Sequence, residues 1–188
     1  MRLNLSQKCE VHITYYPGAE KLNLKLHDII LQKAKGYDWG AVQTGWNEGL
    51  FIKEFKIISD YISKIVENDN LGQKSSDYSS AWRLKLKDLW GQYYRKDDYQ
   101  IDHHHNPHHL SFVYYVNVPK GSAPLVFTDS NKKIFPKPGM IVLFPAWLRH
   151  HVPKHKCEEI RSIISGNFLY MIDDWKKFDI IDESYLLP

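Results

Sequence analysis

Apolar and polar residues follow a helical period in the first half of this 188-residue chain and a strand period in the second half. The clearest helical stripe runs from Leu50 to Val66, because apolar side chains recur there at intervals of three and four residues. Its members are Phe51, Phe55, Ile58, Ile62 and Ile65. An alternation from Cys9 to Tyr15 predicts one early strand, which ends before a Pro-Gly turn signal.

The segment between these two patterns fits two structures. Leu22, Leu24 and Leu26 alternate as in a short strand, whereas a stripe from Leu26 to Ala34 fits a helix. The period alone does not choose between them. Residues 68–80, which follow the clear helical stripe, are polar and contain glycine, so we expect a loop there.

The second half changes character, because short runs rich in β-branched and aromatic residues recur between proline and glycine turn signals. The predicted strands are 90–94, 110–118, 125–128, 140–144 and 160–170. Short strands without helices between them favour an antiparallel sandwich or barrel. We therefore expect one α+β domain over residues 1–188 with a mainly β core. Residues 1–88 would form a helical support region, 89–171 the core and 172–188 a C-terminal extension.

Composition narrows the class of protein. Charged residues make up 25% and hydrophobic residues 43% of the chain, as in soluble globular proteins. The net charge of +3 is too small to favour a nucleic-acid partner. No apolar run approaches the ~18 residues of a transmembrane helix, and the N-terminal segment lacks the apolar core of a signal peptide. Because only Cys9 and Cys157 are present, a disulfide framework is not expected. We expect a cytoplasmic protein that does not bind membranes, and the sequence leaves a homodimer open.

Histidine is concentrated in one tract, where five of the ten histidines lie between His103 and His109. Neutral imidazole is the commonest protein ligand for first-row metals. On an extended segment His103 and His105 point to the same face and can chelate one ion, whereas Asp102 and His104 share the other face. A histidine-rich loop without a function would have the same composition, so the tract alone does not establish a site.

Two later residues could complete such a site. His150 ends an apolar, strand-like run, and Arg161 opens the next one. A histidine in that place is often only a packed or surface residue. A charge that enters an apolar strand must find a partner or face a cavity, because burying it unpaired is costly. An internal ion pair is therefore the simple alternative to an arginine that binds a ligand.

The order of these features resembles a known pattern. The run Trp90–His105, the strand Leu110–Tyr115, the segment Phe144–His150 and the final Arg161 are similar to the iron(II)/2-oxoglutarate-dependent oxygenase superfamily. Within it, the likeness is to small bacterial and phage members with a His-x-His motif and to prolyl hydroxylases. The resemblance covers about residues 88–170. It implies a double-stranded β-helix (jelly roll) core supported by the N-terminal helices, Fe(II), and 2-oxoglutarate as a cosubstrate with O2.

The resemblance also assigns roles to residues. It places the metal ligands, and with them the catalytic centre, on His103, His105 and His150, and it selects His150 over His151. It implies that Arg161 grips the distal carboxylate of 2-oxoglutarate as a bidentate pair. Further contacts with the cosubstrate are implied for Tyr115, Tyr93, Ser111 and Asn167.

Three positions depart from the pattern of the superfamily. Most members have Asp where this chain has His105. Either His105 binds as a third neutral imidazole, or Asp102 or Asp129 supplies a carboxylate and His105 hydrogen-bonds outside the ligand set. In addition, Phe112 stands where a Gly is usual and Gly166 where a Phe is usual, which predicts a reshaped pocket.

The activity implied by the resemblance is a dioxygenase that hydroxylates a C–H bond of a small molecule or peptide, with a lean towards a peptidyl residue. One alternative is a three-His cupin dioxygenase, which would not need 2-oxoglutarate. Another is a non-catalytic jelly-roll module that holds a metal and binds a sugar or belongs to a virion. The aromatic side chains of Trp147 and Trp175 would serve that role.

Overall fold

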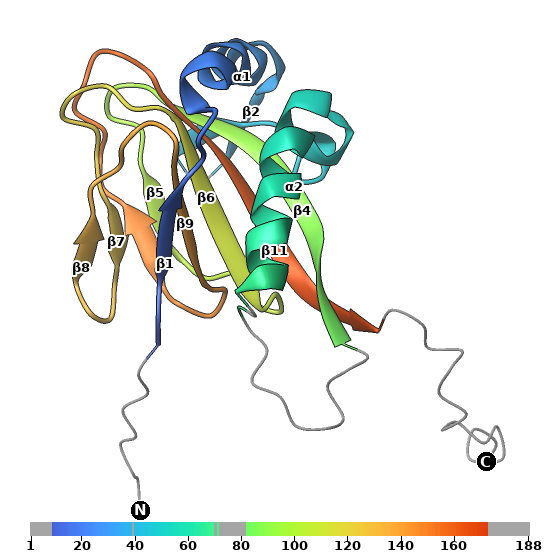
Figure 1. The fold of residues 1–188 in the computed structure, drawn as a ribbon. Coiled ribbons are helices and arrows are strands. Elements are labelled where there is room, and N and C mark those ends of the chain that lie inside the picture. Colours follow the sequence, from blue (N-terminus) through green and yellow to red (C-terminus); the bar gives the residue numbers. More distant parts are fainter. Residues whose placement is uncertain (1–8, 39, 70, 72–81, 173–188) are drawn as a thin grey trace, which may run out of the picture.

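The computed structural model describes residues 9–38, 40–69, 71 and 82–172 (Figure 1). The elements, in chain order, are β1 (His12–Tyr15), α1 (Ala19–Lys33), β2 (Gly36–Asp38), β3 (Ala41–Gln43), a 3-10 turn (Glu48–Phe51), α2 (Lys53–Asn68), β4 (Trp82–Tyr94), β5 (Gln100–His103), β6 (Leu110–Asn117), β7 (Leu125–Phe127), β8 (Lys132–Ile134), β9 (Met140–Pro145), β10 (His150–Val152) and β11 (Arg161–Ile172). Most of the loop expected at 68–80 and of the extension expected at 172–188 lies outside the described residues.

The strands form two antiparallel sheets. The larger has the order β1-β9-β6-β11-β4-β3-β2, and the smaller has the order β5-β10-β7-β8. From β4 to β11 the chain passes repeatedly between the sheets, so that β4, β6, β9 and β11 lie in one and β5, β7, β8 and β10 in the other. This eight-stranded double-sheet arrangement is a jelly roll. The predicted fold class is confirmed, and β1, β2 and β3 widen the larger sheet at its two edges.

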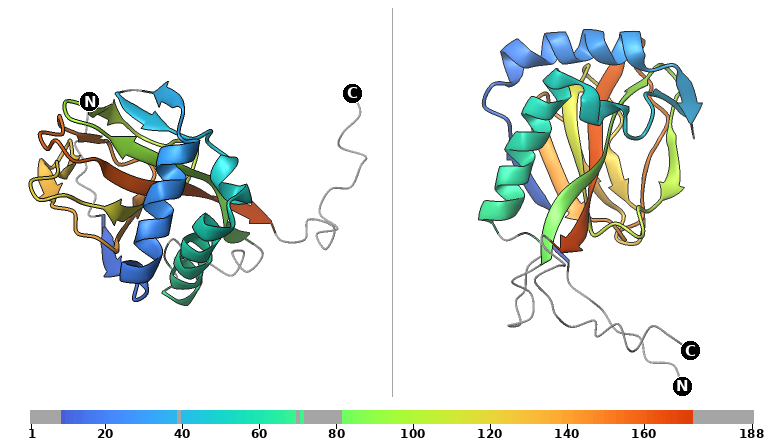
Figure 2. Two further views of the ribbon diagram at one scale, coloured as in Figure 1. Left: turned by 90° about the horizontal axis from the view of Figure 1, so that it is seen from above. Right: turned by 90° about the vertical axis from the view of Figure 1, so that its right-hand side faces the viewer.

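The central strands β6 and β9 are buried on both faces of the larger sheet, which explains why they are nearly continuous apolar runs. On β6, Phe112 and Tyr114 pack against the helices together with Phe55, whereas Val113 and Tyr115 face the smaller sheet. Both helices lie against the outer face of the larger sheet (Figure 2). Because both helices lie on the outer face, the inner face of the larger sheet is covered by the smaller sheet, and the histidines lie between the two sheets.

The structure resolves the ambiguous segment in favour of a helix. In α1, Leu26 and Ile30 are fully buried while Leu24 is 76% exposed, so the leucine alternation does not mark a strand. The second helix begins later than its stripe suggests, because Phe51 lies in the preceding 3-10 turn and is 89% exposed. Within the described residues, no helix combines the length and the apolar character needed to cross a membrane.

The predicted strands are present with shifted bounds, and most of the short strands were missed. β4 begins at Trp82 instead of residue 90, and β1 covers the last four residues of the predicted alternation. Five strands, β2, β3, β7, β8 and β10, have three residues each, and of these only β7 was predicted. Three residues are too few to show a period of two, so pairing with neighbours and not local pattern defines these strands.

Phe112 and Gly166, the two size departures, lie directly opposite each other on β6 and β11. Their side-chain positions face the helices, where Phe112 packs near Phe168. A Cβ on Gly166 would lie 2.6 Å from the Phe112 ring and 2.7 Å from the backbone oxygen of Asp88. The two departures are therefore one complementary exchange of a large and a small residue across neighbouring strands.

Replacing Gly166 with Ala should lower the free energy of unfolding by about 1–3 kcal/mol, because the added methyl overlaps the Phe112 ring. In a Phe112→Ala background, which itself costs about 3–5 kcal/mol, the Gly166→Ala change should cost less by at least about 0.5 kcal/mol. Urea unfolding of the four proteins measures this coupling. Gly36→Ala is the control, since the nearest atom to a Cβ on that strand glycine lies at 3.6 Å. If the changes in the free energy of unfolding at positions 112 and 166 were strictly additive, the two residues would not be a complementary pair.

Candidate metal and cosubstrate site

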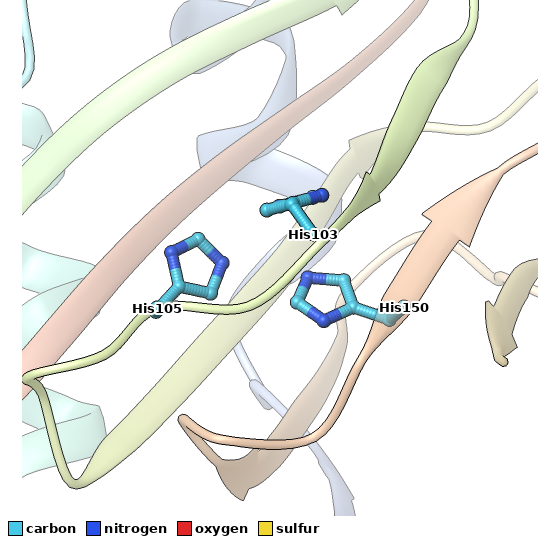
Figure 3. A group of neighbouring side chains, drawn as sticks. All are labelled: His103, His105 and His150. Carbon is cyan, nitrogen blue, oxygen red and sulfur yellow. The ribbon is translucent and has the colours of Figure 1, made fainter. Parts of the chain in front are cut away.

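Three histidines from two strand ends meet in the space between the sheets. His103 is the last residue of β5, His150 is the first of β10, and the two are direct partners in the antiparallel register. His105 lies two residues beyond β5, where its backbone N–H donates to the Ala146 carbonyl over 2.7 Å. The ring centroids are 4.3–5.1 Å apart; His105 and His150 are stacked at 30° between ring planes, and His103 is edge-on to His105 at 81° (Figure 3).

One potential ligand atom from each of these histidines lies within 4.8 Å of the others, which suits a single metal ion. Asp102, the first carboxylate alternative, accepts hydrogen bonds from Thr128 Oγ1 (2.6 Å) and from the Arg149 guanidinium. Asp129 is exposed on the turn after β7. Within the described residues the structure thus brings together three imidazoles, and neither aspartate joins them.

Hydrogen bonds orient two of the rings. Nδ1 of His103 lies 2.7 Å from the Ile101 carbonyl, and Nδ1 of His150 lies 2.8 Å from the Leu148 carbonyl. A carbonyl can only accept, so each Nδ1 carries the hydrogen, and in the neutral ring Nε2 keeps its lone pair. This is the tautomer that a metal bound at Nε2 requires. His151 instead lies beside Thr128 Oγ1 at 3.2 Å.

Burial keeps two of the three rings neutral. Desolvation, together with the neighbouring histidines, lowers the pKa of His105 to about 2 and that of His150 to about 3. A proton and a metal ion compete for the same lone pair. The pocket therefore presents uncharged imidazoles, the form that binds a metal, at neutral pH.

Arg161 lies on β11 in the same interior. Its side chain is 1% exposed, and Nη1 donates to the Ala123 carbonyl over 3.0 Å. Its Nε is buried without a hydrogen-bond partner, and no carboxylate of the described residues forms an ion pair with it. The internal ion pair that the sequence left open is absent from this part of the chain. A buried guanidinium in that situation is suited to an anionic ligand.

Two tyrosines flank this guanidinium. The Arg161 Cζ lies 4.8 Å from the Tyr94 ring centroid and 5.3 Å from that of Tyr115. Burial raises the pKa of both phenols, so both remain neutral donors. The Tyr115 hydroxyl is buried beside the guanidinium, and its O–H donates no hydrogen bond within the described residues. It therefore offers a second unused donor next to the Arg161 Nε.

A single cavity connects the histidines with the arginine. Its lining includes the three histidines together with Arg161, Tyr94 and Tyr115. Gln92 and Gln100 also line this cavity, and they hydrogen-bond to each other at 2.9 Å. Trp46 and Trp90 stack on each other at 4.9 Å beside His105, and Trp46 is 39% exposed.

The structure places three of the expected cosubstrate contacts elsewhere. Tyr93 packs with the helix-side core, and its neighbour Tyr94 occupies the position expected for it. Ser111 and Asn167 are buried, but they hydrogen-bond to each other at 2.8 Å and do not line the cavity. Tyr94 was missed because two adjacent tyrosines on a strand point to opposite faces, and the sequence does not fix which faces inward.

Comparisons with known proteins agree with this fold. No protein-family sequence profile and no curated protein sequence matches the chain. Among solved structures, a viral collagen prolyl hydroxylase from Paramecium bursaria Chlorella virus-1 in complex with 2-oxoglutarate matches with a TM-score of 0.66 at 13% identity, over 86% of this chain and 96% of that one. An oxidoreductase of the 2-oxoglutarate-Fe(II) oxygenase family from Burkholderia pseudomallei gives 0.62 at 10% identity, over 85% and 84%.

A third similar structure is HygX from Streptomyces hygroscopicus with nickel and 2-oxoglutarate bound, with a TM-score of 0.57 at 11% identity over 83% of this chain and 82% of that one. Identities this low establish the fold and not the activity. The chain has the jelly-roll fold of the 2-oxoglutarate-Fe(II) oxygenases, a group of structures that includes prolyl hydroxylases.

Proposed function

We propose that this protein is an iron(II)- and 2-oxoglutarate-dependent dioxygenase that hydroxylates a C–H bond. The observation that carries the proposal is the buried guanidinium of Arg161, which has no acidic partner among the described residues and shares one cavity with three clustered imidazoles. An ordinary structural metal site would not need that cation. A cosubstrate with two carboxylates explains both ends of the cavity.

His103, His105 and His150 would hold the metal on one face and leave its other positions open to cosubstrate and O2. When bound, iron and 2-oxoglutarate supply the oxidising chemistry, through decarboxylation of the cosubstrate. The backbone carbonyls of Ile101 and Leu148 keep two of the rings in the tautomer that can bind. The protein thus contributes ligand geometry and neutral imidazoles.

At the other end, the Arg161 guanidinium and the Tyr115 hydroxyl would hold the distal carboxylate of 2-oxoglutarate. Both groups have unused donors, and both side chains are buried. Tyr94 stacks near the guanidinium and limits its motion. A charge-assisted hydrogen bond in such a dry environment is stronger than the same bond in water.

For the substrate we propose a peptidyl residue. The support is the collagen prolyl hydroxylase among the similar structures and the half-exposed Trp46 ring, which stacks on Trp90 beside His105. An exposed aromatic face at the edge of a cavity suits an aliphatic or cyclic side chain. A small molecule with such a group would fit the same surface.

The three imidazoles also favour a second candidate, a three-His dioxygenase of the cupin type that works without 2-oxoglutarate. The two functions differ in what Arg161 does. In the cupin-type function its cation binds the substrate or only supports the fold, and 2-oxoglutarate has no effect on the metal site.

Anaerobic addition of 2-oxoglutarate to the Fe(II)-loaded protein should produce a visible metal-to-ligand charge-transfer band, since this band requires both partners in one site. Arg161→Ala should weaken 2-oxoglutarate binding by at least about 100-fold through loss of two charged hydrogen bonds. Metal affinity should stay unchanged. The 2-oxoglutarate affinity of Arg161→Lys should lie between those of the wild-type protein and Arg161→Ala, because an ammonium cannot form the bidentate pair.

Arg83→Ala, which changes an exposed arginine at the far end of β4, is the control for this titration. A wild-type protein that binds iron but shows no band would reject the leading function in favour of the cupin-type one. An Arg161→Ala protein with wild-type 2-oxoglutarate affinity would remove Arg161 from the cosubstrate site.

Alanine at His103, His105 or His150 should each lower Ni(II) affinity by more than about 100-fold, because each variant removes a ligand. His104→Ala is the matched control, since His104 is exposed and its Nδ1 accepts a hydrogen bond from the Asn106 backbone outside the cluster. Isothermal titration measures the affinities. Unchanged binding by His105→Ala would show that the third ligand is another group.

A further inference from the structure

His105 is the candidate ligand that no strand holds. His103 and His150 are fixed by the register of β5 and β10, whereas His105 lies in the turn between β5 and β6. A loop residue needs other contacts to hold a ligand geometry, because it lacks the ladder of a sheet. The backbone N–H of His105 donates to the Ala146 carbonyl. The His105 carbonyl and the turn after it need further contacts.

His108 contacts the His105 carbonyl with two of its nitrogen atoms. Its backbone N–H donates to the His105 carbonyl over 2.9 Å, and its ring Nδ1 lies 2.8 Å from the same oxygen. The other ring nitrogen, Nε2, lies 2.7 Å from Oδ2 of Asp88. Both ring nitrogens of His108 thus face acceptors, and the ring bridges the His105 turn to β4.

Asp88 is a buried carboxylate, 8% exposed, on the interior of the larger sheet. Besides His108, Asn167 Nδ2 donates to it over 3.2 Å, and the Asn47 amide, oriented to donate, reaches Oδ1 at 3.0 Å. Ser111 in turn donates to Asn167 over 2.8 Å. Three donors from separate elements therefore fix this carboxylate, although it contacts neither the metal cluster nor the cavity.

We infer that Asp88 and His108 form a positioning pair that orients His105 as the third metal ligand. Partners behind a metal ligand commonly fix its geometry and affect metal affinity by about 10–100-fold. The pair acts through the backbone of the turn, in contrast to His103 and His150, whose own Nδ1 atoms bond to the carbonyls two residues earlier in the chain. This gives a role to the buried carboxylate of Asp88, which lies 17 positions before His105 and on another strand. The inference rests on the proposed metal site but not on 2-oxoglutarate.

A purely structural role for the pair would change stability and leave metal binding alone. The experiment therefore measures Co(II) binding to the full chain, by titration and by the visible d–d spectrum, which reports ligand geometry. Asp88→Asn and His108→Ala should each weaken Co(II) binding by about 10–100-fold and alter the spectrum. His108→Asn should recover part of the affinity, because its amide nitrogen can replace Nδ1 in the bond to the His105 carbonyl.

Asp98→Asn is the matched control. Asp98 is also a buried carboxylate, 6% exposed, and it accepts hydrogen bonds from the Arg95 backbone (2.8 Å) and Nε (3.2 Å) in the turn between β4 and β5. This variant should lower the unfolding midpoint and leave Co(II) affinity and spectrum unchanged. Wild-type Co(II) affinity and spectrum in both Asp88→Asn and His108→Ala, or equal weakening by Asp98→Asn, would overturn the inference.

The outcome can be separated from that of the proposed function. A wild-type protein that binds Co(II) but gives no charge-transfer band with Fe(II) and 2-oxoglutarate would reject the dioxygenase and leave the positioning pair standing. A wild-type protein that binds no Co(II) would reject both.

Discussion

The antiparallel register between β5 and β10 is the constraint on which the candidate site depends. Because His103 and His150 are direct partners across these strands, their rings lie on one face at 4.3 Å between centroids without help from a loop. A slip of one residue in either strand would turn one ring to the opposite face. The smaller sheet is only four strands wide, so each of its strands must be held by pairing and by packing against the larger sheet.

The interior between the sheets also has to accommodate a buried positive charge. Arg161 enters through β11, whose long pairing with β4 places it directly opposite Tyr94. The two aromatic rings and one carbonyl that surround the guanidinium compensate only part of the cost of removing it from water. A bound carboxylate would satisfy the remaining donors. Arg161 thus links the stability of this interior to the occupancy of the cavity.

Much of this arrangement could be predicted from the sequence, and what could not has a physical reason. The apolar runs of β6 and β9 and the stripe of α2 follow directly from burial. Ligand chemistry suggested the pairing of His103 with His105, and the resemblance to the oxygenases added His150, which the structure brings beside them. Tyr94 was missed in favour of Tyr93 because strand facing depends on register, which is a property of the whole sheet. Ser111 and Asn167 were expected beside the cosubstrate. They lie on the interior face, but they belong to the hydrogen-bond network of Asp88, which no local pattern reveals.

The third imidazole has an electrostatic consequence for such a site. In the proposed site, a neutral His105 ligand would leave the metal centre one unit more positive than an aspartate would. Asp102 does not make up the difference, because its carboxylate is engaged by Arg149 and Thr128 on the other face of β5. With Arg161 in the same cavity, the interior carries a net positive charge until an anion enters. A dianion such as 2-oxoglutarate would therefore be attracted at both ends, by the metal and by the guanidinium, and a neutral ligand would not.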